Sequence, residues 1–188
     1  MKTRIFTLDV GSGSNPKDIA RGNISLDLVK RPGNKPNNFV CGDAHNLPFK
    51  DSVFDKVFFC EVIEHIENPS KCLTEIHRVL LPNGLLFLST PNMYFWRIVL
   101  RELRGKHSIL GGTGHIAAFT ASEIINLLSR IGFADVQIDY ETWIFMRTHC
   151  LDKVIKRLLP KNMTEQNTLA TCRKRGQGSV DISGAKDR

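Results

Sequence analysis

The stretch Ile5-Phe6-Thr7-Leu8-Asp9-Val10, followed by Gly11-Ser12-Gly13, decides the fold of this chain. A short apolar run that closes on two glycines is typical of a buried strand entering a tight loop. The glycines let the backbone turn sharply and approach a ligand closely. Alone, this signal also fits a dinucleotide-binding loop or an ordinary strand–loop turn. The third glycine of the dinucleotide pattern is absent, because Pro16 stands in its place.

Short strands and amphipathic helices alternate along the rest of the chain. Further strands are predicted at Ile24–Leu28, Asn38–Cys41, Val57–Cys60, Leu85–Ser89, Val136–Tyr140 and Thr168–Cys172. One helix is predicted from Asn68-Pro69 to Pro82-Asn83-Gly84, and another from the capping box of Thr120 and Glu123 to Gly132. A short basic helix is expected at Asp152–Leu159. We therefore predict an α/β fold, a Rossmann-like open sheet that is mostly parallel with an antiparallel last strand and helices on both faces.

Carboxylates stand where the first four strands end, at Asp9, Asp27, Asp43 and Glu61. In open α/β sheets the ligand binds outside the carboxyl ends of the strands. An acid in an apolar strand is costly to bury unless it binds a donor. The hydroxyls of a ribose suit Asp27, and an exocyclic amine of a base suits Asp43. Each of these acids alone would be interpreted as a surface residue. Four of them at the ends of four successive strands indicate a ligand site.

At these residues the sequence resembles the class I S-adenosylmethionine-dependent methyltransferases, and most closely the branch with the ubiquinone and menaquinone methyltransferases. The resemblance runs from about Ile5 to Phe133 and continues more weakly to Cys172. It is carried by Asp9-Val10-Gly11-Ser12-Gly13, Asp27, Gly42-Asp43-Ala44, Leu47-Pro48-Phe49, Phe54-Asp55, Glu64-His65-Ile66, Arg78 to Gly84, His115 and Phe119-Thr120.

The resemblance implies that the cofactor is S-adenosylmethionine. The cofactor-binding residues it implies are Asp9, Gly11, Gly13, Asp27, Asp43, Ala44 and Cys60. By the same resemblance, Asp9 and the Cys60 carbonyl would lie near the methionine ammonium, and Ala44 would offer its backbone N–H to the adenine ring. The charges agree, because a sulfonium and an ammonium favour carboxylates and carbonyls. A dinucleotide would instead need a phosphate cradle with three glycines.

Methyl transfer is an in-line displacement that needs alignment, and a base only where the acceptor loses a proton. The candidate catalytic bases are His115, in the loop beyond the fifth strand, and His65, after the fourth; each could instead have a structural role. Asn92 is a further candidate contact for the acceptor. Tyr94 to Arg104 reads as an aromatic and basic helix. We expect it to pack on the core, with an acceptor lid or a membrane-surface helix as alternatives.

Composition sets further limits. Five cysteines form no C-x-x-C pair, so no metal site is predicted. No apolar run is long enough for a signal peptide or a membrane span, so the expected location is the cytoplasm. The net charge of +7 is concentrated in residues 145–188, where ten basic residues face four acids. We expect one methyltransferase domain over residues 1–175 and a disordered polar tail over 176–188.

The predicted acceptor is a small-molecule or lipid-like compound. An RNA acceptor bound by the basic C-terminal region is the first alternative. The second is an inactive subunit that binds the cofactor, suggested because family members close the site with helices ahead of the first strand, which here begins near Ile5. A nicotinamide-dependent oxidoreductase is the remaining alternative. The sequence predicts no transmembrane segment, leaves membrane-surface contact open, and indicates neither the accepting atom nor the oligomeric state.

Overall fold

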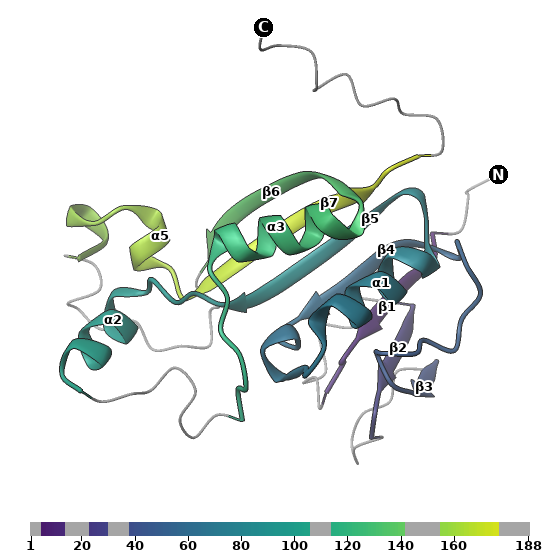
Figure 1. Ribbon diagram of the computed structural model, residues 1–188, viewed down its shortest axis with the longest axis horizontal. Coiled ribbons are helices and arrows are strands. Elements are labelled where there is room, and N and C mark those ends of the chain that lie inside the picture. The colour runs from purple at the N-terminus through teal and green to yellow at the C-terminus, as the bar shows by residue number, and fades with distance from the viewer. Residues whose placement is uncertain (1–4, 14–22, 30–37, 106–113, 142–154, 177–188) are drawn as a thin grey trace, which may run out of the picture.

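The computed structural model describes residues 5–13, 23–29, 38–105, 114–141 and 155–176. In these ranges seven strands form one sheet in the order β3-β2-β1-β4-β5-β7-β6 (Figure 1). The strands are β1 (Thr7–Val10), β2 (Ile24–Asp27), β3 (Phe39–Cys41), β4 (Phe54–Cys60), β5 (Leu80–Pro91), β6 (Phe133–Glu141) and β7 (Asn167–Lys174). Neighbours from β3 to β5 are parallel, whereas β7 is antiparallel to β5 and β6. The predicted α/β fold is confirmed.

The topology brings the strand ends together. Because β1 to β5 are parallel, their carboxyl ends lie along one edge of the sheet. The chain adds β2 and β3 on one side of β1, and β4 and β5 on the other. The strand order therefore reverses between β1 and β4, which is where ligands bind in open α/β sheets.

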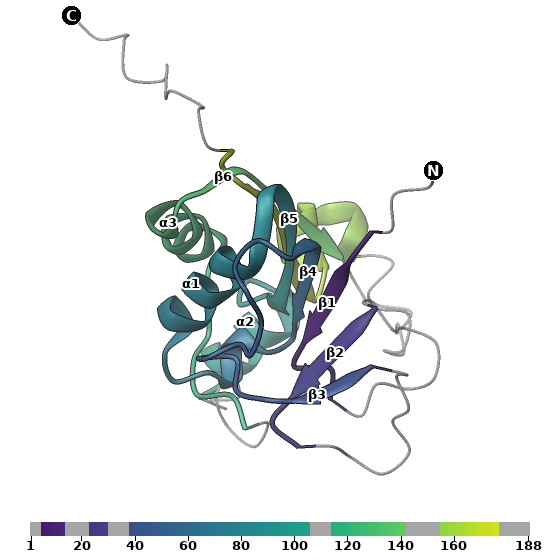
Figure 2. The same cartoon turned by 90° about the vertical axis from the view of Figure 1, so that its right-hand side faces the viewer.

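Two helices cover one face of the sheet, α1 (Pro69–Val79) and α3 (Ala121–Ile131), and they lie side by side (Figure 2). The start signals predicted from sequence are both formed. The Asn68 side chain accepts a hydrogen bond from the backbone N–H of Lys71, and Thr120 and Glu123 form a complete capping box. The left-handed Gly132, with φ 107°, ends α3.

The remaining short helices are η1 (Ile63–His65), α2 (Trp96–Leu103), α5 (Lys161–Thr164) and the helical residues 155–158. Figure 1 shows α2 and α5 beyond the carboxyl end of β5. The prediction of helices on the face opposite α1 and α3 falls partly on residues 14–22 and 142–154, which lie outside the described residues. So does the start of the basic helix expected at Asp152.

The core lies where β4 and β5 meet α1 and α3. Its largest fully buried side chains are Phe54, Phe59, Leu8, Leu26, Ile63, Leu73, Ile76, Leu80, Leu86, Leu88, Ile124 and Leu128. Burying a side chain of this size stabilises the fold by about 1.5–3 kcal/mol before conformational entropy is counted. This core fixes the strands whose ends carry the site.

β5 is longer than the sequence predicts. The segment Pro82-Asn83-Gly84 was expected to end the helix ahead of a strand at Leu85, but α1 ends at Val79 and β5 runs through the segment from Leu80. Asn83 has a positive φ of 65°, so the backbone does bend there. Leu80 nevertheless pairs with Phe54, and the register against β4 shifts before Lys56 pairs with Leu85. Turn-forming residues thus make an irregularity inside the strand, because tertiary pairing resumes on both sides.

Candidate functional site

The first cavity, here called the glycine-loop cavity, lies at the carboxyl ends of β1 to β4 and has a volume of about 610 Å³. It is lined by Gly11, Gly13, Leu26, Asp27, Leu28, Gly42, Asp43, Ala44, His45, Glu61, Val62, His65, Ile66 and Glu67. Five of the seven predicted cofactor-binding residues are in this set. They come from three separate strand ends, as the parallel topology requires.

The glycine loop is held by backbone contacts to β2. The N–H of Gly11 donates to the carbonyl of Leu26 at 2.8 Å. The N–H of Gly13 donates to the Asp27 carboxylate at 2.7 Å, which aims that carboxylate at the loop. Gly11 has φ 73°, and a Cβ there would lie 2.4 Å from a methyl carbon of Val62. Only glycine lets this loop take that backbone conformation and pack so closely against Val62.

Asp43 is the second carboxylate, after Asp27, in the lining of this cavity. Its Oδ1 accepts hydrogen bonds from the backbone N–H of His45 at 2.9 Å and from the His45 ring at 2.8 Å. These bonds hold the pKa of the Asp43 carboxyl below its ordinary value. The carboxylate therefore stays charged at neutral pH. Beside it, Ala44 is buried against the cavity.

Arg78 of α1 holds the segment that carries Asp43 in place. Its guanidinium donates to the backbone carbonyls of Leu47 and Phe49 and to the carboxylate of Glu75. Glu75 in turn accepts from the backbone N–H of Leu47 at 2.8 Å. Arg78 belongs to one of the sequence motifs, but its type and spacing predict no role for it. Its contacts with Leu47 and Phe49 form only when α1 packs beside that segment, so no local sequence pattern predicts them.

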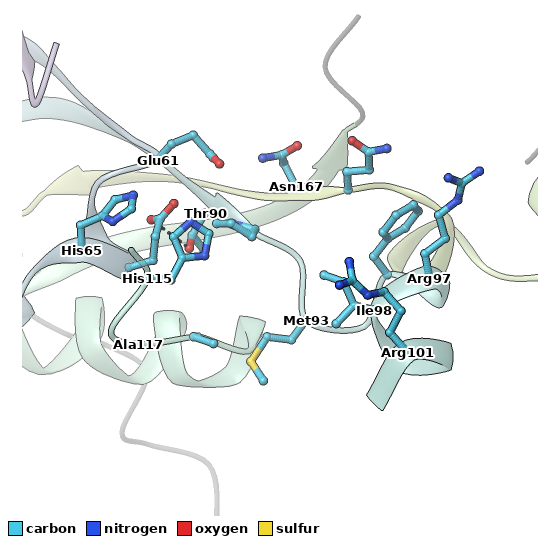
Figure 3. Close-up of a pocket in the computed structure, with 15 residues that line it drawn as sticks. Glu61, His65, Thr90, Met93, Arg97, Ile98, Arg101, His115, Ala117 and Asn167 are labelled. Carbon is cyan, nitrogen blue, oxygen red and sulfur yellow. Dashed lines mark hydrogen bonds between the residues drawn. The ribbon is translucent and has the colours of Figure 1, made fainter. Parts of the chain in front are cut away.

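The second cavity, here called the histidine cavity, has a volume of about 640 Å³. It is lined by Glu61, Glu64, His65, Thr90, Pro91, Met93, Phe95, Arg97, Ile98, Arg101, His115, Ala117, Ala118, Gln166 and Asn167. Figure 3 shows His65 and His115 side by side at one end, and Arg97 and Arg101 at the other. The two ring centroids of the histidines are 4.8 Å apart. The structure thus brings both predicted catalytic residues together.

Glu64 lies next to these histidines and is buried, with 1% of its surface exposed. Its Oε2 accepts from the hydroxyl of Thr90 at 3.3 Å. Burial, with a smaller contribution from the charge of Glu61, raises the pKa of Glu64 to about 7. Sequence analysis included Glu64 in a motif but did not single it out, because its burial depends on η1 folding under the end of β5.

The two cavities meet at Glu61 and His65, which line both of them. Glu61 follows β4 with a positive φ of 55°, a conformation that few residues other than glycine adopt. The Glu61 carboxylate accepts from the hydroxyl of Ser89 at 2.6 Å, and its N–H bonds to the carbonyl of that residue. Such local strain is typical of functional sites, where the surrounding structure maintains it.

Comparison with known proteins finds a family match for part of the chain. Residues 8–88 match the family described as "Methyltransferase domain". These residues belong to a methyltransferase domain. The malonyl-[acyl-carrier protein] O-methyltransferase of Methylococcus capsulatus is 31% identical over 150 residues, which cover 78% of this chain and 53% of that protein. The demethylmenaquinone methyltransferase of Bacteroides fragilis is 31% identical over 142 residues, covering 64% of this chain and 57% of that protein. The chain thus spans about half the length of these two relatives.

Solved structures agree on the fold of this methyltransferase domain. A Thermotoga maritima protein described as an S-adenosylmethionine-dependent methyltransferase superimposes with a TM-score of 0.69 at 17% identity, over 92% of this chain and 84% of that one. The predicted resemblance to the class I S-adenosylmethionine-dependent methyltransferases is confirmed, and it implies S-adenosylmethionine as the cofactor.

The glycine-loop cavity of the methyltransferase domain fits that cofactor. Asp27 and Asp43 give it an anionic wall, which suits a molecule that carries a sulfonium and an ammonium group. Gly11, with a positive φ, packs directly against Val62 and so carries no side chain into the lining of the cavity. Between the two glycines, the hydroxyl oxygen of Ser12 is buried and has no hydrogen-bond partner in the described part of the chain. A buried polar atom of this kind is expected to meet a polar ligand.

Asp9 and Cys60 lie deeper in the methyltransferase domain. Asp9 is buried within β1, and Cys60 is the last residue of β4. Neither is among the described residues that line the two cavities. Their implied contacts with the methionine ammonium stay a prediction.

The expectations for α2 and Asn92 need correction. α2 was expected to pack on the core, but none of its residues is buried, and Arg97, Ile98 and Arg101 line the histidine cavity instead. The Asn92 side chain donates to the backbone carbonyls of Asn162 and Glu165, both at 2.7 Å, and so joins β5 to the α5 region rather than facing an acceptor. Among the described residues, no helix is long and apolar enough to span a bilayer.

Proposed function

We propose that the chain transfers the methyl group of S-adenosylmethionine, bound in the glycine-loop cavity, to a small-molecule or lipid-like acceptor in the histidine cavity. The observation that carries the proposal is that the two cavities share Glu61 and His65. In this proposal the methyl group passes from one cavity to the other beside these two residues. Alignment of this kind is the main contribution that a protein makes to an in-line displacement.

In this proposal the acceptor atom bonds to the methyl carbon while the carbon–sulfur bond breaks. The electron pair stays on sulfur, and S-adenosylhomocysteine leaves. The ribose and methionine parts are held by Asp27, Gly11 and Gly13. The adenine is held by Asp43 and Ala44. The methionine ammonium lies near Asp9 and the Cys60 carbonyl. His65 and His115 are the candidate bases where the acceptor carries a proton. Their rings face the same cavity, within 4.8 Å of each other.

The wall of the histidine cavity supports an acceptor with an apolar body. Met93, Phe95 and Ile98 are part of its lining. Figure 3 shows Met93 between the histidines and the end at which Arg97 and Arg101 stand. Cavities that are mostly apolar with a few placed polar groups are typical small-molecule sites. The relatives named above act, by their names, on malonyl-[acyl-carrier protein] and on demethylmenaquinone. We take the domain to comprise residues 1–175 and its location to be the cytoplasm.

The test is release of S-adenosylhomocysteine by the full chain with a panel of acceptors: quinols, carboxylic acids, acyl thioesters and total RNA. We expect turnover with a member of the first three classes, and a loss of at least about 10-fold in kcat for His115→Ala. His77→Gln is the matched control, because His77 packs on Phe133, remote from both cavities. Turnover with RNA alone, weakened steeply by salt, would favour the RNA alternative. Cofactor binding without turnover on any acceptor would favour the inactive subunit.

A further inference from the structure

Three potential metal ligands converge at one end of the histidine cavity: Glu64, His65 and His115. One ligand atom from each lies within 4.8 Å of the other two. The first two residues come from η1, and the third comes from the loop ahead of α3. Residues fifty positions apart in sequence thus meet at a single point, on the wall where the acceptor would lie.

The Glu64 carboxylate has one oxygen without a partner. Oε2 accepts from Thr90, but no donor in the described ranges reaches Oε1, although the residue is almost wholly buried. A buried carboxylate oxygen with no donor is costly and calls for an explanation. A cation at this point supplies one. The neighbouring charge of Glu61 adds to the negative field that would attract it.

The hydrogen bonding of His65 leaves a suitable lone pair free. Its Nδ1 lies 2.9 Å from the carbonyl oxygen of Gly114, and a carbonyl can only accept. In the neutral ring Nδ1 therefore carries the hydrogen, and Nε2 is left with an unshared electron pair. Metal-binding histidines show this pattern, in which one ring nitrogen donates to a carbonyl and the other binds the ion.

The two segments that carry the ligands are joined by backbone hydrogen bonds. The carbonyl oxygen of Glu64 accepts from the N–H of Ile116 at 2.9 Å and from the N–H of Ala117 at 3.2 Å. His115 is therefore fixed relative to Glu64 before any ion arrives. Preorganisation of this kind reduces the cost of assembling a site on binding.

We propose that Glu64, His65 and His115 bind one divalent transition-metal cation, such as Mn²⁺, Co²⁺ or Zn²⁺, with open coordination positions facing the histidine cavity. Two imidazoles and one carboxylate form a ligand set typical of such ions, whereas Mg²⁺ prefers oxygen ligands. Metal–ligand distances near 2.1 Å would draw the three side chains slightly together from their present spacing.

This inference rests on the proposed function for what the ion would do. An ion here would bind an acceptor oxygen and lower the pKa of an acceptor hydroxyl, so that its proton passes to water. The histidines would then act as ligands and not as bases, because the same lone pair serves either role. No metal site was predicted from the spacing of the cysteines, and this cluster forms only in the folded chain.

The test is calorimetric titration of the tag-free full chain with Co²⁺ alone, after removal of bound metal by chelation and dialysis. We expect one ion to bind per chain. We expect Glu64→Gln and His115→Ala each to weaken binding by at least about 100-fold, since even the outer partners of metal ligands are worth 10- to 100-fold. His77→Gln should bind as the wild type does. The thermal unfolding temperature of the wild type should rise with Co²⁺, and this rise should be absent in the Glu64 and His115 variants.

The absence of saturable Co²⁺ binding by the wild type would overturn the inference, as would binding that persists unchanged in Glu64→Gln and His115→Ala. Circular dichroism of each variant shows whether a loss of binding merely reflects unfolding. Because the titration uses neither cofactor nor acceptor, its result is separate from that of the turnover assay. Binding of S-adenosylmethionine and turnover without Co²⁺ binding would refute the metal site alone. Co²⁺ binding without turnover would refute the proposed function alone.

Discussion

Gly11 lies where the backbone and the neighbouring side chain both exclude a larger residue, so Gly11→Ala is a sharp perturbation of the glycine loop. Its φ of 73° is in the left-handed region, which costs an alanine about 1–2 kcal/mol. The added Cβ would also lie 2.4 Å and 3.0 Å from the two methyl carbons of Val62. Forcing an extra carbon into a packed site costs about 1–3 kcal/mol. Together these give a loss of about 2–5 kcal/mol in the free energy of unfolding.

Gly13 provides the matched control. It has φ 57°, but the nearest atom to a Cβ there is 3.9 Å away, which is ordinary contact. Gly13→Ala should therefore lose only the backbone part, about 1–2 kcal/mol. The assay is urea unfolding followed by circular dichroism, on both variants and on the wild type. For a domain of this size each kcal/mol corresponds to a shift of roughly 2–4 °C in the unfolding temperature.

The double variant Gly11→Ala/Val62→Ala separates the two causes. Removing the methyl carbons of Val62 should recover the steric part, about 1–3 kcal/mol, and leave the backbone part in place. The two substitutions should therefore be strongly non-additive. Equal losses for Gly11→Ala and Gly13→Ala, or additive losses in the double variant, would refute the account of this loop.

Three further predictions concern residues that hold the site in place. Arg78→Ala removes the guanidinium donor from the partly buried carbonyls of Phe49 and Leu47, and among the described residues only the Leu47 carbonyl keeps a second donor, the N–H of Phe49. The substitution should cost about 1–3 kcal/mol in urea unfolding, with weaker binding of S-adenosylmethionine by calorimetry. Arg78 lowers the pKa of Glu75, so the ion pair stabilises the fold fully above the ordinary carboxyl pKa of 4.5. The difference in the free energy of unfolding between the wild type and Arg78→Ala should therefore become smaller as the pH falls below that value. Thr120→Ala removes the cap of α3 and should cost about 1 kcal/mol, with cofactor affinity unchanged. Asn92→Ala should cost about 1–3 kcal/mol in the same unfolding assay, because it removes the amide donor from two partly buried backbone carbonyls.

Each of these predictions has a control or a contrary result. Arg130→Ala, an exposed arginine in the last turn of α3, should change stability by less than about 0.5 kcal/mol. An Arg78→Ala protein as stable as Arg130→Ala would contradict the role given to the guanidinium. For Thr120, a change in cofactor affinity would contradict the separation of α3 from the site. For Asn92, an increase in KM without a loss of stability would restore the acceptor contact.

The strands and the cofactor side of the site follow from local sequence. Apolar runs that close on glycine or an acid predict where each strand ends, and parallel pairing then brings these ends together. Asp27, Asp43 and Gly11 were found in this way. The capping signals at Thr120 and Asn68 succeeded because they depend on only three or four consecutive residues.

The acceptor side could not be predicted in the same way. Glu64 becomes buried only when η1 folds under β5, and it meets His115 only because a loop fifty residues later returns to it. The apolar face of α2 suggested core packing, since hydrophobic periodicity reports that a helix has an apolar face but not what that face meets. Here Ile98 lines a cavity together with the two basic residues Arg97 and Arg101. The burial of Glu64 and the position of α2 depend on contacts between segments that are distant in sequence. Local sequence patterns do not predict such contacts.

The central claim is tested most directly by calorimetric titration of the full chain with S-adenosylmethionine, S-adenosylhomocysteine and NAD. The account predicts saturable binding of both adenosyl compounds and none of NAD. It predicts a loss of about 10- to 100-fold in Asp27→Ala, because a charge-assisted hydrogen bond is worth about 1.5–3 kcal/mol. Asp139→Asn, at the exposed far edge of the sheet, should bind as the wild type does. Failure of the wild type to bind either adenosyl compound, or equal binding of NAD, would contradict the account.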